Sequence, residues 1–456
     1  MKNGFRADRA SAGLIFSLAW PNMLENLMDT LVQYMDTAMV GSLGTAATAA
    51  VGCTSTVNWL VGSSVSAVGI GFLSYISKAL GAGDRERAAR ASAQAVLSTV
   101  VLGLFFTVLT LGLADRVPVW MKADESIRDT AALYFSILYA PMLFRSAKII
   151  FGTLLRASGD MKTPMRVGIG VNIVNVVLNF FFIYSTRTVR LGQLSVIIPG
   201  AGLGVTGAAI ASAASFVYGG TAISLALWRH GTISPRGRTI APDAEILKPC
   251  LRVAVPNMLQ RFCTSLGYVV FASMINSLGE ISTAAHTIAN TVESAFYNPG
   301  YGMQAATATL TGNCIGARDR DRLKKLTSNA VILEAGMMII SGGLLFAFAP
   351  GMVSLFSRDP EVISLGSRVL RMVALSEPFY GISVVTEGML QGAGLTKRPF
   401  IFNVSCMWGI RILGTFICVS LLGLGLVSAW GCMIANNMTL LVLFRLYWSK
   451  ERDRLC

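Results

Sequence analysis

Charged residues are scarce in this chain, and their scarcity argues against a soluble fold. Of its 456 residues, 14% are Asp, Glu, Lys or Arg, whereas 53% are hydrophobic and the mean hydropathy is +0.60. Such a chain is expected to lie mostly in a lipid bilayer. The net charge of +14 does not indicate nucleic-acid binding, because the positive charges are sorted by loop, as in membrane proteins.

Catalytic and nucleotide-binding motifs are also missing. The chain contains no H-E-x-x-H, no G-x-S-x-G and no G-x-x-x-x-G-K-[ST] loop, and it has two histidines, His230 and His286. These absences argue against a membrane-embedded enzyme and against transport driven by ATP. The eight cysteines form no C-x-x-C, so we interpret them as packing residues and expect no cofactor.

Twelve long apolar runs separated by short polar turns predict an all-α polytopic membrane protein. We place the twelve transmembrane helices at residues 14–40, 48–76, 92–114, 130–155, 166–185, 200–227, 252–276, 283–312, 328–349, 363–391, 400–422 and 426–447.

The positive charges of the loops predict the orientation of the protein in the membrane. With the N-terminus inside, the inner loops hold about four times as many Lys and Arg residues as the outer loops. We therefore expect a multi-pass protein of the plasma (inner) membrane with both termini in the cytoplasm.

An internal repeat predicts two lobes. P-N-M-L and S-L-G recur in residues 20–44 and 255–279, and Gly44 lies 235 positions before Gly279. The same offset relates "LGAGDRERA" to "IGARDRDRL" and "LRASGDMKTP" to "LQGAGLTKRP". Each half has six helices, so the two lobes should be related by a pseudo-two-fold axis along the membrane normal. We assign residues 1–228 to the first lobe, 229–250 to a cytoplasmic linker and 251–456 to the second lobe.

Three carboxylates interrupt the first apolar run. At about 100° per residue, Glu25, Asp29 and Asp36 lie on one helix face, which Asn22 and Gln33 widen. An ionised carboxylate facing lipid costs about 2.5–3.5 kcal/mol, so this stripe should face a cavity or other helices. Glu25 and Asp29 fit a structural role as well as a functional one, whereas Asp36 is the stronger functional candidate.

Potential partners for Asp36 occur in the fifth and sixth predicted helices. Asn172, Asn175 and Asn179 form one ridge at spacings of three and four, and Ser212 adds a hydroxyl near mid-membrane. A carboxylate among neutral oxygen donors can bind a proton or a hard cation such as Na⁺. The sequence thus predicts a cation site at Asp36, Asn175, Asn179 and Ser212. The alternative is an asparagine ladder that only holds helices together.

The second half contains its own buried ionisable residues. Glu293 and Arg411 both fall near mid-depth of predicted helices, where an ion pair between them would be chiefly structural. We leave open whether either residue takes part in transport.

The order and spacing of several motifs resemble those of the multidrug and toxic compound extrusion (MATE) family, within the wider multidrug/oligosaccharidyl-lipid/polysaccharide exporter superfamily. The resemblance covers nearly the whole chain. It rests on the second-half counterparts above and on "YMDTAMVGSLG", "LGAGDRERA", "LRASGDMKTP", "NIVNVVLNFFFIYS" and "GVTGAAIAS".

This resemblance implies a V-shaped antiporter that exports amphipathic, often cationic compounds in exchange for H⁺ or Na⁺. The family's central coupling aspartate falls on Asp36, its fifth-helix asparagine on Asn175 and its helix-bending proline on Pro21. Many members carry an aspartate where this chain has Asn179. The acids of sodium-coupled relatives in the seventh and tenth helices fall on Thr264 and Tyr380, which makes a second-lobe cation site of that type doubtful.

Two further expectations concern cargo and partners. An alternative on the same fold is a flippase or exporter of a lipid-linked or other endogenous metabolite, although the chain has few central Lys or Arg residues. The expected partners are small amphipathic or cationic substrates and the lipid bilayer, with no nucleic acid, and we expect the protein to function as a monomer.

Overall fold

The structure is a computed structural model, which describes residues 9–121, 123–191 and 194–455. The first half contains α1 (Arg9–Gly41), α2 (Thr45–Gly81), α3 (Arg85–Leu113), α4 (Arg116–Trp120), α5 (Glu125–Tyr139), α6 (Met142–Ala157), α7 (Lys162–Ile183) and α8 (Gly204–Arg229). The second half contains α9 (Ala244–Asn276), α10 (Glu280–Gly316), α11 (Arg320–Ser354), α12 (Pro360–Ala374), α13 (Glu377–Gly392), α14 (Lys397–Cys406), η1 (Met407–Ile412), α15 (Leu413–Thr415), η2 (Phe416–Leu421) and α16 (Leu426–Arg452).

The helices reproduce the sequence repeat. Helices α9 and α10 begin and end 235 positions after α1 and α2, and α12 and α13 do the same after α5 and α6. The caps agree as well: the Asp84 side chain accepts a hydrogen bond from the backbone of the first turn of α3, and Asp319 does so for α11. The repeat inferred from three short motifs therefore extends to helix boundaries and caps.

The predicted spans correspond to these helices. Among the described residues, eight single helices are long and apolar enough to cross a membrane, and two bent pairs, α5 with α6 and α12 with α13, raise the number to ten. Helices α1 and α10 have 33 and 37 residues, so they are also long enough to span a bilayer, although polar residues interrupt them. The protein is an all-α polytopic membrane protein, as the sequence predicts.

Several predicted helices differ in detail. The runs 130–155 and 363–391 are not continuous, because α5 and α6 meet at 50° and α12 and α13 at 53°. A proline lies at each break: Pro141 caps α6, and Pro378 stands in the first turn of α13, where its missing N–H disrupts no helical bond. The run 400–422 includes two π-helical turns, η1 and η2.

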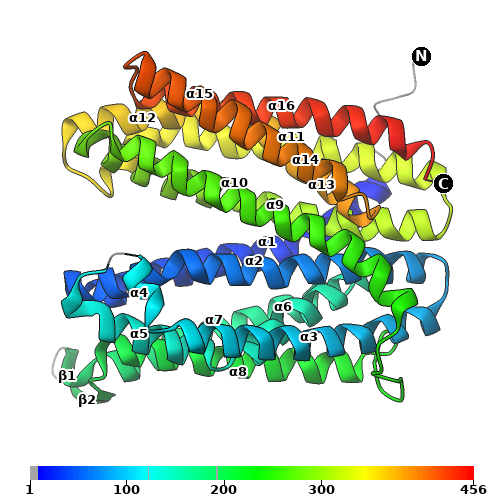
Figure 1. The fold of residues 1–456 in the computed structure, drawn as a ribbon, viewed down its shortest axis with the longest axis horizontal. Helices are drawn as coiled ribbons and strands as arrows, with labels where there is room; N and C mark the ends of the chain where they lie inside the picture. The colour runs from blue at the N-terminus through cyan, green and yellow to red at the C-terminus, as the bar shows by residue number, and fades with distance from the viewer. Residues whose placement is uncertain (1–8, 122, 192–193, 456) are drawn as a thin grey trace.

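A small antiparallel hairpin joins α7 to α8. Strands β1 (Ser185–Leu191) and β2 (Leu194–Ala201) pair with Ser185 opposite Ala201. The predicted helices 166–185 and 200–227 ran slightly into this segment, which the apolar pattern alone did not distinguish from helix ends. The hairpin lies outside the helix bundle (Figure 1).

The two halves form two layers of roughly parallel and antiparallel helices (Figure 1). We call the end with the linker, the α2–α3 loop and the end of α16 the terminal end, and the opposite end the hairpin end. The layers meet toward the terminal end, and their ribbons diverge toward the hairpin end (Figure 1). The lobe boundaries at residues 228 and 251 stay predictions, as does the placement of residues 1–8, which lie outside the described range.

The halves interlock in their hydrophobic cores. Ile15 and Ala19 of α1 belong to a cluster formed mostly by the second half, with Leu310 and Trp448. In the same way, Cys250 and Ala254, near the start of α9, belong to the main cluster of the first half. The symmetric exchange of helix starts buries apolar surface between the halves near the terminal end.

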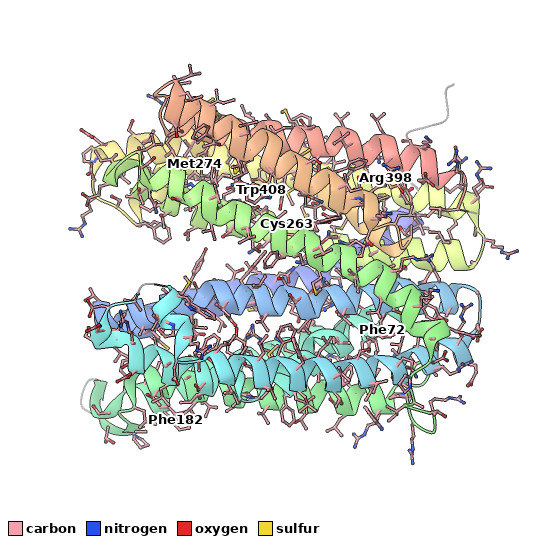
Figure 2. All side chains as sticks on the ribbon, viewed as in Figure 1. Phe72, Phe182, Cys263, Met274, Arg398 and Trp408 are labelled. Atoms are coloured by element: carbon pink, nitrogen blue, oxygen red, sulfur yellow. The ribbon has the colours of Figure 1, made fainter. Side chains whose placement is uncertain are left out.

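Side chains on the outer face of the second half also join separate helices. Trp408, at the second residue of η1, lies beside Cys263 of α9 (Figure 2). Its indole Nε1 donates to the Cys263 carbonyl over 3.2 Å. This bond anchors the π-helical segment to α9.

Candidate functional site

The structure brings together the four residues predicted around Asp36. Asn179 Nδ2 donates to Asp36 Oδ1 over 2.6 Å, and it also lies 3.1 Å from Asn175 Oδ1. Asn175 in turn lies 3.2 Å from Ser212 Oγ. Asn175 and Asn179 are buried, whereas Asp36 is only half-buried. The three helices α1, α7 and α8 therefore converge on one carboxyl group that keeps partial access to its surroundings.

The Asn175 amide has two useful orientations. One of its two terminal atoms lies 2.9 and 3.2 Å from the Asp36 carboxyl oxygens, and the other lies 3.2 Å from Ser212 Oγ. With nitrogen toward Asp36, the amide donates to an ionised carboxylate and its oxygen accepts from Ser212. With oxygen toward Asp36, it accepts from a protonated carboxyl and its nitrogen donates to Ser212. The site can therefore hydrogen-bond both forms of Asp36.

One acceptor in this cluster is left unused. Asn179 Oδ1 is buried and has no hydrogen-bond partner in the structure. Such orphaned acceptors are uncommon, because an unmet buried polar group costs about 1–3 kcal/mol. A protonated group or a cation bound near Asp36 would give the Asn179 oxygen the partner that it lacks. The structure thus brings the four residues together, and their binding of a small positive ion stays a prediction.

Glu25 has a structural partner. Its Oε2 lies 2.7 Å from Arg156 Nη2, and the Glu25 side chain is largely buried. A Cβ atom at Gly168 would lie 2.8 Å from Glu25 Oε1, so glycine at that position makes room for the carboxylate. The ion pair joins α1 to the end of α6, well away from Asp36 along α1.

The other predicted polar residues of α1 separate into different surroundings. Asp29 accepts a hydrogen bond from Asn172 Nδ2 over 2.7 Å. Gln33 is exposed, and its side chain makes no hydrogen bond in the described structure. Pro21 is buried within α1, which is helical from Arg9 to Gly41. The structure therefore brings Asn172 and Asp29 together but leaves Gln33 outside both groups.

The second half does not contain the Glu293–Arg411 ion pair that the sequence allowed. Both residues are buried, but they form no ion pair within 4.0 Å. The Arg411 guanidinium instead lies over two rings, 4.6 Å from the centroid of Tyr268 and 4.2 Å from that of Phe271. Cation–π contacts of this kind hold the charge against α9 in place of a carboxylate.

Sequence analysis missed Glu334, the most completely buried acid. It has 0% exposure, and neither of its carboxyl oxygens has a hydrogen-bond partner. Cβ atoms at Gly300 and Gly381 would each lie 2.8 Å from its Oε1, so two glycines leave space for the group. Glu334 falls within the predicted helix 328–349, and the rule that acids inside spans are exceptional would have identified it.

The halves are bonded to each other at the terminal end. Lys78 Nζ of α2 donates to the Ala393 carbonyl over 2.7 Å, and Ser74 Oγ donates to the Gly392 carbonyl over 3.0 Å. Thr309 of α10 donates to the Arg156 carbonyl at the end of α6 over 3.1 Å. We call these three bonds the terminal latch, since each half caps the end of a broken helix of the other.

Close backbone packing accompanies the latch. A Cβ atom at Gly81 would overlap the Asn313 carbonyl, and one at Gly316 would overlap the Lys78 carbonyl. Helices α2 and α10 can therefore approach only because both positions are glycine. Toward the hairpin end, the contact of Tyr34 Oη with the Thr291 carbonyl over 3.0 Å also joins α1 to α10.

Comparison with known proteins identifies the class of this molecule. The MatE family model matches residues 21–181 and 256–417, which is most of the chain and falls in both halves. The chain belongs to the MatE family, whose members are transporters, so the protein is a membrane transporter and not an enzyme.

Individual relatives match this chain over nearly their whole length. The chain is 27% identical to the probable multidrug resistance protein NorM of Thermotoga maritima, over 96% of this chain and 93% of that protein. It is 25% identical to the probable multidrug resistance protein YoeA of Bacillus subtilis, over 95% and 93%. A crystal structure of MATE in complex with MaD3S superposes with a TM-score of 0.89 at 25% identity, over 98% and 97% of the chains.

Proposed function

We propose that this protein is a secondary antiporter of the plasma membrane that exports amphipathic, often cationic compounds in exchange for protons by alternating access. The relatives' names support drug export, since they are multidrug resistance proteins that match nearly the whole chain. The proposal places both termini in the cytoplasm, takes the monomer as the working unit and requires no cofactor besides the coupling ion.

The observation that carries the proposal is the convergence of Asn175, Asn179 and Ser212 on Asp36. Export against a gradient needs a group that binds a small cation in one state and releases it in the other. Asp36 is the only carboxyl group in this cluster, and rotation of the Asn175 amide satisfies it with or without a proton.

We take H⁺ rather than Na⁺ as the coupling ion, because few oxygens face the Asp36 carboxyl in this arrangement. A bound Na⁺ needs several oxygens that converge on it, as hard cations generally do. In this arrangement the Asn179 amide presents nitrogen, not oxygen, to the carboxyl. Its own oxygen is among the unpartnered atoms, so an amide rotation would be required before it could join a Na⁺ site. Sodium coupling therefore remains the alternative outcome of the test.

The terminal latch supplies the second requirement, a barrier that opens on one side at a time. In this proposal the closed latch seals the cytoplasmic side and the protein faces outward; the three bonds between the halves support this assignment. Protonation of Asp36 removes a charge among α1, α7 and α8, and this change would favour release of a cationic substrate to the outside. The proton can shift the equilibrium only by its different affinity for the two states.

Vesicle transport with separate gradients tests the proposal. Purified protein is reconstituted into liposomes with a fluorescent cationic dye, and either a pH gradient or a Na⁺ gradient is imposed. We expect dye movement with the pH gradient alone, accompanied by counter-movement of protons. Dye movement with the Na⁺ gradient alone would mean that Na⁺, and not H⁺, is the coupling ion. Flipping of a labelled lipid-linked glycan without dye movement would favour the flippase alternative.

A further inference from the structure

A basic cavity lies at the terminal end, beside the last turn of α8. Its volume is about 620 Å³, and it is bounded by the start of α3, the last turn of α8 and the beginning of the linker. Four arginines contribute to its walls, together with Trp228 and the hydroxyl residues Thr232 and Ser234; the arginines are Arg85, Arg229, Arg236 and Arg238. None of the four residues clustered at Asp36 lines this cavity.

Most of its positive charge is uncompensated. Arg238 pairs with Glu86, the carboxylate that also lines the cavity. Arg85, Arg229 and Arg236 form no ion pair with any residue that the structure describes. The equivalent of Arg85 in the second half is Arg320, which lies 235 positions later and pairs with Asp453 over 3.1 Å. The first half thus keeps free a charge that the second half neutralises.

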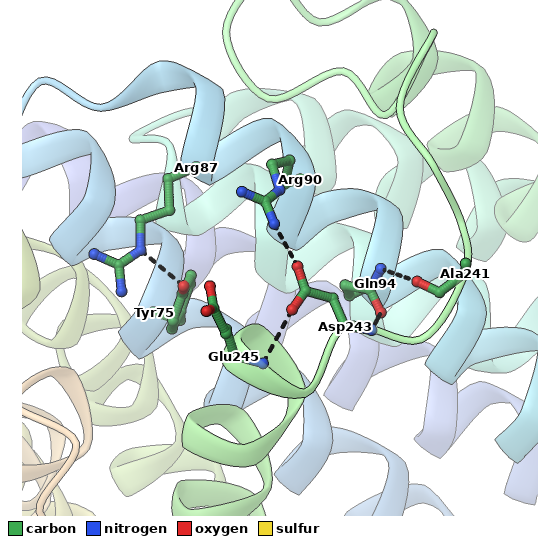
Figure 3. A network of polar contacts seen from close by, with 7 residues as sticks. All are labelled: Tyr75, Arg87, Arg90, Gln94, Ala241, Asp243 and Glu245. Atoms are coloured by element: carbon green, nitrogen blue, oxygen red, sulfur yellow. Dashed lines mark hydrogen bonds and ion pairs between the residues drawn. The ribbon is translucent and has the colours of Figure 1, made fainter.

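The cavity wall is held in shape by the linker. Asp243 lies 2.6 Å from Arg90 Nη2, and its backbone N–H donates to Gln94 Oε1 over 3.0 Å. Gln94 Nε2 donates back to the Ala241 carbonyl over 2.7 Å (Figure 3). These bonds fasten the end of the linker to α3, so the loop between His230 and Ala241, which carries Arg236 and Arg238, is held at both ends. A preformed loop lowers the ordering cost of binding a ligand.

The position of Trp228 sets the depth of the cavity in the membrane. Trp228 and Leu225, in the last two turns of the apolar helix α8, are 39% and 53% exposed. Tryptophan concentrates where hydrocarbon meets headgroups, and Leu225 one turn deeper would contact acyl chains. The arginines immediately beyond Trp228 therefore lie at the level of lipid phosphates.

We propose that this cavity binds the phosphate headgroup of an anionic phospholipid from the same leaflet, with its acyl chains along α8 beside Trp228. Guanidinium groups bind phosphate through two parallel N–H donors, and three unpaired arginines exceed the single charge of a phosphodiester. Basic pockets at helix ends on the cytoplasmic side are suited to such lipids. The apolar surface next to the cavity favours a lipid over a free phosphate ion.

Native mass spectrometry of the detergent-purified full-length protein tests this proposal without a transport assay. We expect phosphatidylglycerol to bind more tightly than phosphatidylcholine of the same chain length. The double variant Arg229→Gln, Arg236→Gln should weaken phosphatidylglycerol binding on the order of 25-fold, because each arginine near the surface contributes about a factor of five.

A matched control separates the cavity from general surface charge. The double variant Arg322→Gln, Lys325→Gln removes two exposed charges at the same end of the bundle, outside the cavity. It should keep phosphatidylglycerol binding within about twofold. Equal losses in both variants, or no preference for phosphatidylglycerol in the wild type, would overturn the proposal. Displacement of phosphatidylglycerol by millimolar inorganic phosphate would show that the cavity takes free phosphate instead.

Discussion

Asn179 and Asp36 stand 143 positions apart in the chain, and yet the Asn179 amide donates to the Asp36 carboxyl over 2.6 Å. This bond ties the hairpin-end part of α1 to the last turns of α7. A change in the charge of Asp36 therefore acts directly on a bond between two helices.

Replacing Asp36 by Asn should abolish dye export driven by a pH gradient. Asparagine keeps the size and hydrogen-bonding capacity of aspartate but cannot take up and release a proton. The measurement is dye efflux from proteoliposomes, with monodisperse size-exclusion behaviour as the control for folding. Undiminished export by a folded Asp36→Asn protein would remove Asp36 from the coupling mechanism.

Replacing Asn175 by Ala should slow export by about tenfold or more, equivalent to about 1.4 kcal/mol. The variant loses an amide whose rotation can serve both forms of Asp36 and leaves Ser212 without this partner. Initial rates of dye efflux at several pH values measure the effect. Asn436→Ala, a buried asparagine of α16 that bonds to Asn437, is the matched control and should export normally.

Replacing Lys78 by Met should loosen the terminal latch. A hydrogen bond from a charged donor contributes about 1.5–3 kcal/mol, of which burial of the lysine offsets a part, so we expect a shift toward opening of this end on the order of tenfold. Distances between spin labels at the exposed positions Ala82 and Ala317, in a protein with its native cysteines replaced, report the opening.

The control for this experiment is Lys248→Met, which removes an exposed lysine at the same end of the bundle without an ion pair in the described structure. It should leave the distance distribution unchanged. If Lys78→Met also leaves it unchanged, the bond to Ala393 does not hold the terminal end closed.

Glu334→Met should raise the apparent melting temperature of the purified protein. The substitution removes two buried carboxyl oxygens that have no partner, each of which costs about 1–3 kcal/mol, and adds a flexible apolar side chain. Glu334→Gln keeps two unpartnered polar atoms and should give no such gain. A loss of stability in Glu334→Met would show that Glu334 has bonding partners under the conditions of the measurement.

His230, beyond the end of α8, should make stability depend on pH. Partial burial lowers the pKa of His230 below 6.5, and its Nδ1 accepts from the backbone N–H groups of Thr232 and Ile233. The folded state thus favours the neutral ring, so the stabilisation is full above about pH 6.5 and declines as the pH falls below it. Thermal unfolding between pH 5 and 8 should show a smaller acid loss for His230→Gln than for the wild type.

Much of the fold could be predicted because its signals are local in sequence. The length and apolarity of each run placed the spans, and the shared offset of Gly44 and Gly279 placed the repeat that the helix boundaries follow. The bends between α5 and α6 and between α12 and α13 were missed, since a proline in the first turn of a helix leaves the hydrophobic pattern intact. The hairpin was missed for a related reason, because its strands lie at the ends of two apolar runs.

The candidate site was predictable only where residue types restrict the choice. Asp36 and the asparagine ridge were identified because acids and amides inside spans must find polar partners. The same reasoning named Glu293 and Arg411 but paired them wrongly, since an arginine can also be held by aromatic rings such as Tyr268. Their roles in transport, like those of Glu25, Asp29, Gln33, Asn172 and Pro21, stay predictions.

By itself the sequence determined that this chain spans a membrane, that it arose from two similar halves and which few side chains are costly enough in lipid to require partners. Tertiary structure alone decided which partners they have: Arg156 for Glu25, Asn172 for Asp29, and a backbone carbonyl of the opposite half for Lys78. The physical reason is the distance along the chain over which each of these effects acts. Hydropathy and helix periodicity depend on neighbouring residues, whereas a hydrogen bond or an ion pair depends on atoms that only the packing of distant helices brings within about 3 Å.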